Sequence, residues 1–208
     1  MKIPEYLDEI QHAVAVVMGE IYREQHEVER LSGELRELQA ATNDGYARVD
    51  FLALNPDLDD EGLGTAIYWD TYFGPDKDRH QKNAEFEQVV ARVGVHEFSV
   101  NALCANLLQY AKQGLSLHFG KERAGCPDGR LLGGIPMHEV IWQARNQALH
   151  WEDGTFRPPI CKCFDELALT ADPVFAQYKH INMANEIVRY LGWNSPEDFT
   201  RDMMRFVS

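Results

Sequence analysis

Apolar residues recur at spacings of three and four along the first forty residues of the chain. The series is interrupted only at Glu24 and comprises Leu7, Ile10, Val14, Val17, Ile21, Val28, Leu31, Leu35 and Leu38. This pattern predicts one long helix over residues 5–41 that ends at Thr42-Asn43-Asp44-Gly45, so that residues 1–45 form a segment distinct from residues 46–208. Such a seam suits a coiled coil between chains and equally a helix packed on its own domain.

Shorter amphipathic stretches follow, separated by residues that favour turns. Residues 46–60 have the composition of a loop, and the periodic segments after it predict helices over residues 61–73, 77–93, 95–113, 173–191 and 196–206. In the first of these helices, Tyr68, Trp69 and Tyr72 are expected in the core. Arg157-Pro158-Pro159 predicts an extended link. The chain is therefore expected to be all-α, a helical bundle with a long N-terminal helix.

The helix with the clearest start and stop is predicted over residues 136–153. Pro136 suits its first turn and Gly154 suits its end. At about 100° per residue, one side carries a narrow apolar seam. The seam consists of Met137, Ile141, Ala144, Ala148 and Trp151, and a polar stripe of Glu139, Gln143, Asn146 and His150 lies almost opposite.

This polar stripe differs from an ordinary solvated helix face. Such a face carries mostly Lys, Glu and Asp, whereas this one carries Gln, Asn and His between the large apolar Trp142 and Leu149. The composition indicates a surface that meets another protein, RNA, or both.

The segment Arg145-Asn146-Gln147-Ala148-Leu149-His150 resembles the R-N-x-x-x-H signature of HEPN domains (higher eukaryote and prokaryote nucleotide-binding). In that signature, four to six residues separate an Arg from a following His, and the residue straight after the Arg is often polar; Arg145 and His150 are separated by four residues. The resemblance covers at most about residues 95–190. It implies a helical bundle, a homodimer, and metal-independent cleavage of RNA by a toxin or defence effector, which an antitoxin or another defence-system protein would accompany.

The residue types fit that chemistry. An imidazole titrates near neutral pH, which suits proton transfer to and from ribose oxygens. A guanidinium pairs with phosphate oxygens and suits the charge that develops on phosphorus. Cleavage needs a base for the 2′-hydroxyl, a cation for the phosphate and an acid for the leaving 5′-oxygen, and a single Arg145 and His150 are few for these three tasks. Two polar stripes facing each other across a twofold axis would supply two of each. The resemblance thus implies that Arg145, His150 and Asn146 are catalytic, with Asn146 orienting the imidazole or contacting RNA.

Substrate-binding candidates lie on the same helix and in the loop before it. Glu139 and Gln143 belong to the polar stripe, and Lys121 and Arg123 lie in the Gly-rich connection 114–134, which is either functional or a plain insertion. The window 112–162 carries a small positive charge, although the whole chain has a net charge of −13. That overall charge argues against a general nucleic-acid binder.

No metal or cofactor is expected, because Cys161-Lys162-Cys163 lacks a second ligand pair at standard spacing. The four cysteines are expected to be reduced in a cytoplasmic protein without a membrane anchor. Two alternatives to the ribonuclease stay open. One is a non-catalytic HEPN-like binding or scaffold module, in which His150 caps its helix and Arg145 pairs with Glu152 or Asp153. The other is a coiled-coil adaptor that acts through residues 5–41.

Overall fold

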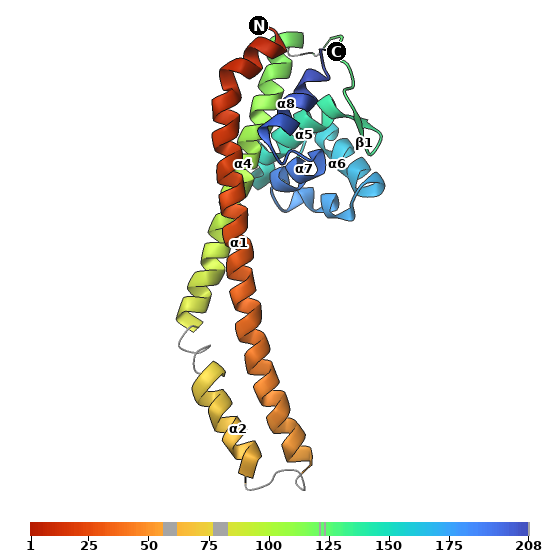
Figure 1. The fold of residues 1–208 in the computed structure, drawn as a ribbon. Coiled ribbons are helices and arrows are strands. Elements are labelled where there is room, and N and C mark those ends of the chain that lie inside the picture. Colours follow the sequence, from red (N-terminus) through yellow and green to blue (C-terminus); the bar gives the residue numbers. More distant parts are fainter. Residues whose placement is uncertain (56–61, 77–82, 121, 123, 208) are drawn as a thin grey trace. The chain divides into compact units, whose positions relative to one another are not determined.

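The computed structural model describes residues 1–55, 62–76, 83–120, 122 and 124–207 (Figure 1). The chain divides into two compact units. The first combines residues Met1–Glu24 with Phe98–Ser208, and the second is Gln25–Glu97. Helices α1 and α4 contribute to both units, and each unit is described by itself below.

The described residues are mostly helical, as the sequence predicts. The helices are α1 (Ile3–Leu54), α2 (Leu63–Thr71), α4 (Asn83–Phe119), α5 (Met137–His150), α6 (Pro158–Thr170), α7 (Ala184–Leu191) and α8 (Pro196–Met204). Short helical turns are η3 (Tyr72–Asp76), η4 (Trp151–Asp153) and η5 (Pro173–Lys179), and two strands of two residues each, β1 (Leu131–Leu132) and β2 (Ile135–Pro136), pair antiparallel. None of the described helices is long and apolar enough to span a membrane.

In the first unit, the start of α1 packs on α4. Leu7, Val14 and Ile21 of the predicted seam are all buried, and the Tyr6 hydroxyl donates to the Tyr110 carbonyl at 3.0 Å. The helices approach closely at Gly114, where an added Cβ would lie 2.9 Å from the Tyr6 ring. This half of the seam is therefore buried within the chain. Leu31, Leu35 and Leu38 have side chains outside those that the structure describes, so an intermolecular coil there stays a prediction.

In the second unit, α1 continues past the Asn43-Asp44-Gly45 segment at which the sequence predicts its end. Gly45 remains helical and faces α2, where an added Cβ would lie 2.4 Å from Thr71 Oγ1. Close packing against α2 therefore overrides a local stop signal. The loop predicted over residues 46–60 is wrong for residues 46–54, and residues 56–61 lie outside the described part of the chain.

Three further boundaries differ from the sequence-based prediction. From residue 83 onward, the predicted helices 77–93 and 95–113 form one helix, α4, because a single glycine such as Gly94 weakens a helix by only about 1 kcal/mol. Residues 77–82 lie outside the described part of the chain. The predicted helix 173–191 is instead divided into η5 and α7. Pro158 and Pro159 begin α6 rather than an extended link; only Arg157 before them is extended, and a proline needs no N–H in a first helical turn.

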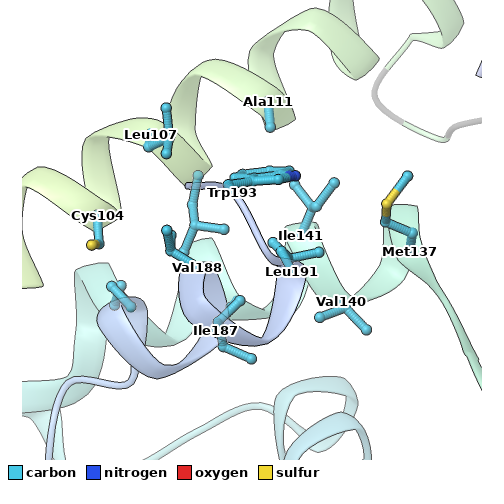
Figure 2. Close-up of a cluster of buried hydrophobic side chains, with 14 of the residues drawn as sticks. Cys104, Leu107, Ala111, Met137, Val140, Ile141, Ile187, Val188, Leu191 and Trp193 are labelled. Carbon is cyan, nitrogen blue, oxygen red and sulfur yellow. The ribbon is translucent and has the colours of Figure 1, made fainter. Parts of the chain in front are cut away.

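The core of the first unit lies where α4, α5 and α7 meet (Figure 2). Figure 2 shows Leu107 and Ala111 of α4 above side chains of α5 and α7, with the Trp193 ring between the layers. All of these side chains are buried. This packing fixes the inner side of α5 and so determines which of its residues face outward.

A buried carboxylate joins the end of the chain to the segment before α5. Asp202 accepts hydrogen bonds from Trp193 Nε1 at 2.9 Å and from Arg130 Nη2 at 2.9 Å, and Arg130 Nη2 also donates to the Leu191 carbonyl. Arg205 Nε lies 3.3 Å from the same carboxylate. The charge of Asp202 is thus paired and fully hydrogen-bonded, as a buried carboxylate requires.

Replacing Ser195 by alanine should destabilise the first unit by about 1 kcal/mol. The Ser195 side chain is the N-cap of α8 and accepts a hydrogen bond from the Asp198 amide at 3.3 Å, which alanine cannot do. Thermal unfolding measures the loss. Thr200→Ala, at an exposed position of the same helix, is the matched control and should leave the melting temperature nearly unchanged. Equal melting temperatures for Ser195→Ala and wild type would contradict this role of the cap.

Candidate functional site

Helix α5 has the bounds that the sequence predicts to within a turn. It runs from Met137 to His150 and continues as η4 to Asp153, and Gly154, at φ +65°, ends it. Pro136 is not in the first turn but in β2 directly before the helix. The Met137 amide donates to the carbonyls of Asp128 and Arg130, both at 3.0 Å, so the preceding segment holds the start of α5 in place.

The buried side of α5 is wider than the predicted seam. Met137, Ile141, Ala144 and Ala148 are buried as expected, whereas Trp151 of the predicted seam is only half-buried. Val140, Gln143 and Gln147 are buried as well. Gln147 has no exposed surface: its Nε2 donates to the carbonyls of Tyr178 and Ile181, both at 2.8 Å, and its Oε1 accepts from the Met183 amide at 3.0 Å. It therefore links α5 to the connection between η5 and α7.

The buried side of α5 includes part of the predicted polar stripe. Gln143 is 5% exposed and its Nε2 donates to Glu139 Oε1 at 2.7 Å. Burial, followed by the charges of Glu139 and Glu166, raises the pKa of Cys163 on α6 to about 12. Glu139 therefore lies on the α6 side of the helix. Gln143 is covered by packing against the bundle, and its role in substrate binding stays a prediction.

Arg145 lies on the other side of α5 and reaches α4. Its Nε donates to Gln109 Oε1 at 2.6 Å, and its Nη1 donates to Asn146 Oδ1 at 3.1 Å. Both acceptors are neutral amides, and no carboxylate among the described residues forms an ion pair with Arg145. Partial burial lowers the pKa of Arg145. The guanidinium is thus held by two neutral amides, with no acidic partner among the described residues.

Asn146 forms a hydrogen bond with Arg145. Its side-chain carbonyl accepts from Arg145 Nη1, and no described hydrogen bond joins it to His150. The arrangement makes Asn146 a residue that orients the guanidinium rather than the imidazole. The predicted ion pair of Arg145 with Glu152 or Asp153 is not found among the described contacts either.

His150 stands at the end of α5 and is open to solvent. Its Nδ1 lies 3.2 Å from Asp153 Oδ2, and both side chains are 59% exposed. An ionised carboxylate only accepts hydrogen bonds, so this pair suits the tautomer with its proton on Nδ1, which leaves a lone pair on Nε2. A histidine held in this way can take a proton at Nε2. The same local pair also fits a histidine that caps a helix end.

Helix α4 contributes a further cation to the side of α5 that carries Arg145. Lys112 Nζ lies 4.6 Å from the centroid of the Trp142 ring, one turn of α5 before Arg145, and Leu149 is 46% exposed one turn after it. The face therefore combines positive charge with exposed apolar surface. The other two predicted substrate-binding residues, Lys121 and Arg123, lie outside the described residues.

Two residues of this arrangement were not predicted as site residues. Gln109 is 36 positions from Arg145 in the sequence, and nothing in its local pattern indicates that the two side chains meet. Asp153 was considered as a partner of Arg145 but pairs with His150. The spacing of three between His150 and Asp153 on a helical turn could have indicated that pair.

The positions of the cysteines and possible metal ligands in the described part of the chain bear on thiol and metal chemistry. No group of three or more His, Cys, Asp or Glu residues there could hold a metal ion. Cys163 is buried, and Cys161 Sγ donates to the Phe156 carbonyl at 3.8 Å. Burial raises the pKa of Cys104 to about 12, which makes it a poor nucleophile at neutral pH.

Comparison of the chain with protein-family models, with curated proteins and with solved structures finds no match. The likeness to HEPN domains therefore rests on the Arg145–His150 segment and its place in a helical bundle.

Proposed function

We propose that the chain is a metal-independent endoribonuclease of the HEPN type, in which Arg145 and His150 from two copies form one composite site. The observation that carries this proposal is the state of Arg145. This arginine is oriented by two neutral amides, Gln109 and Asn146, and it has no carboxylate partner among the described residues. A guanidinium positioned in this way is suited to a phosphate group.

The proposed reaction needs two imidazoles. Nε2 of one His150 removes the proton from a ribose 2′-hydroxyl, and the resulting oxygen attacks the adjacent phosphorus. Arg145 stabilises the negative charge of the pentacoordinate phosphate. The second His150 donates a proton to the leaving 5′-oxygen. The products are a 2′,3′-cyclic phosphate and a 5′-hydroxyl, and the two histidines exchange protonation states.

The exposed surface around the motif supports an assembly of two copies. Leu149 is 46% exposed between Arg145 and His150, and Trp142 stands one turn before Arg145 on the same side. An apolar border beside charged groups is typical of protein interfaces. In a twofold dimer, this face would meet itself and place both pairs of motif residues in one cleft. Toxicity or defence against phage is the biological setting that we infer for such an enzyme, with a partner protein that restrains it.

A non-catalytic binding module is the second candidate, and one observation favours it. His150 and Asp153 form a local pair at the end of a helix, which needs no catalytic purpose. In that case the polar face of α5 would serve only as an interface.

Cleavage of RNA should proceed in EDTA, because the proposed mechanism uses no metal ion. A labelled RNA oligonucleotide incubated with the full chain should yield fragments that end in a 2′,3′-cyclic phosphate, which mass spectrometry identifies. DNA of the same sequence should remain intact because it lacks the 2′-hydroxyl. Activity that disappears on chelation and returns with Mg²⁺ or Mn²⁺ would refute the mechanism.

A further inference from the structure

Five aromatic side chains of the second unit form one connected cluster, which we call the aromatic cluster. It consists of Tyr46 of α1, Tyr68 and Trp69 of α2, and Tyr72 and Phe73 of η3. The rings of Tyr68 and Tyr72 stack with centroids 6.1 Å apart, and those of Trp69 and Phe73 stack at 5.4 Å. Tyr46 contacts Tyr68 at 6.2 Å and so joins α1 to the cluster.

The aromatic cluster is exposed, which contradicts the expectation that these rings form core. Tyr68, Trp69, Tyr72 and Phe73 are 39%, 47%, 43% and 59% exposed. Gly45 of α1 lies close to Thr71 of α2, and the rings of Tyr46 and Tyr68 also contact each other between the two helices. Connected aromatic surface left open to water commonly marks a site of interaction.

The charge of the second unit restricts what can bind there. Residues 25–97 contain 7 Lys and Arg against 16 Asp and Glu, a net charge of −9. Asp70 is exposed between Trp69 and Thr71, and Asp50 is exposed on α1. A nucleic acid would be repelled by this charge. A second copy of the same unit would bring an equal negative charge and would be repelled as well.

A basic protein segment has the complementary chemistry. Lys and Arg side chains are attracted to the acidic residues, and they also bind the faces of Trp and Tyr rings. Apolar side chains of the same segment would cover the exposed edges of Trp69 and Phe73, as aromatic and apolar residues do in the centres of interfaces. An amphipathic helix with one apolar and one basic side presents both kinds of group together.

We propose that the aromatic cluster is a docking surface for a basic, amphipathic helical segment of a partner protein. The proposal does not depend on the ribonuclease activity, because it uses a different unit of the chain. It gives the adaptor alternative a definite location on α2 and η3, rather than on the apolar seam of α1.

Fluorescence anisotropy with synthetic peptides tests this docking surface on the full chain. The probe is a labelled amphipathic helix of leucine and lysine, and its counterpart has glutamate in place of lysine. The lysine peptide should bind wild type with a micromolar Kd, and the glutamate peptide should not bind. Trp69→Ser with Phe73→Ser should weaken binding at least tenfold. Leu117→Ser with Leu169→Ser, which removes two exposed apolar side chains of the first unit, is the matched control and should leave the Kd unchanged.

Several results would overturn the proposal. These are equal affinity of wild type and the Trp69/Phe73 variant for the lysine peptide, binding of both peptides alike, and no binding at all. Labelled single-stranded RNA that binds wild type but not the Trp69/Phe73 variant would show a nucleic-acid surface instead. Light scattering tests whether a second copy of the chain occupies the surface. A wild-type oligomer that dissociates in this variant would show that a second copy covers the cluster. Circular dichroism confirms that the exposed substitutions leave helix content intact.

Discussion

Replacing His150 by alanine should lower the rate of RNA cleavage by about 10²–10⁴-fold, the contribution typical of a general acid or base. RNA affinity should change little, because the proposed role of the imidazole is to move protons. Stability should also change little, since the His150 side chain is 59% exposed and its described partner, Asp153, is equally exposed. Single-turnover cleavage, RNA binding and thermal unfolding measure the three quantities separately.

Two variants sharpen the test at His150. Asp153→Asn keeps a polar group beside Nδ1 but removes its negative charge, so it should reduce cleavage by less than His150→Ala and leave binding unchanged. His180→Ala, at another exposed histidine of the same unit, should keep full activity. A His150→Ala protein that cleaves RNA normally but melts several degrees lower would show that the pair with Asp153 is only structural. The non-catalytic alternative would then be preferred.

The features of α5 that could be predicted from the sequence are those that depend on local spacing. Gly154 marks its end because a positive φ favours glycine, and the apolar seam marks its inner side. The width of the buried arc could not be predicted from spacing alone. Gln143 and Gln147 are buried because other elements supply their hydrogen-bond partners or cover them, and those elements are set by tertiary packing.

The residues of the candidate site likewise include some that local spacing predicts and others that only tertiary packing brings together. Arg145, Asn146 and His150 are named by a pattern within one helix, and their neighbour Asp153 lies on the next turn. Gln109, however, meets Arg145 only because α4 packs beside α5.

The helix boundaries predicted from the sequence are wrong where a tertiary contact outweighs a local signal. Asn43-Asp44-Gly45 resembles a helix end, but Gly45 provides the room in which Thr71 approaches α1. The aromatic residues of α2 resemble core by composition, but their rings are left at the surface. Composition gives the hydrophobicity of a segment, whereas the neighbouring helix decides which of its sides is covered.

Replacing Arg145 by alanine should depress turnover by about 10²–10³-fold, as removal of a single group that stabilises transition-state charge does. Arg145→Lys should recover only part of the rate, since an ammonium cannot reproduce the planar fork that Gln109 and Asn146 hold in place. Arg157→Ala, at an exposed arginine of the same unit, should keep full activity. A structural role for Arg145 would instead lower the melting temperature of both Arg145 variants and leave their cleavage intact.

Mixed dimers of the His150→Ala and Arg145→Ala chains decide whether the site is composite. Each parent homodimer lacks both copies of one group, whereas the mixed dimer keeps one Arg145 and one His150. If the two chains share one cleft, the mixed dimer brings the remaining Arg145 of one chain to the remaining His150 of the other. It should then cleave RNA faster than the His150→Ala parent, which has no imidazole, though far below wild type, which has the two imidazoles that the mechanism uses. If each chain acts alone, no site in the mixed dimer is complete and activity should stay at the level of the parents. Tagging the two chains differently isolates the mixed species, and light scattering at micromolar concentration verifies that it is a dimer. A monomer at that concentration would refute the composite cleft directly, whatever the rates.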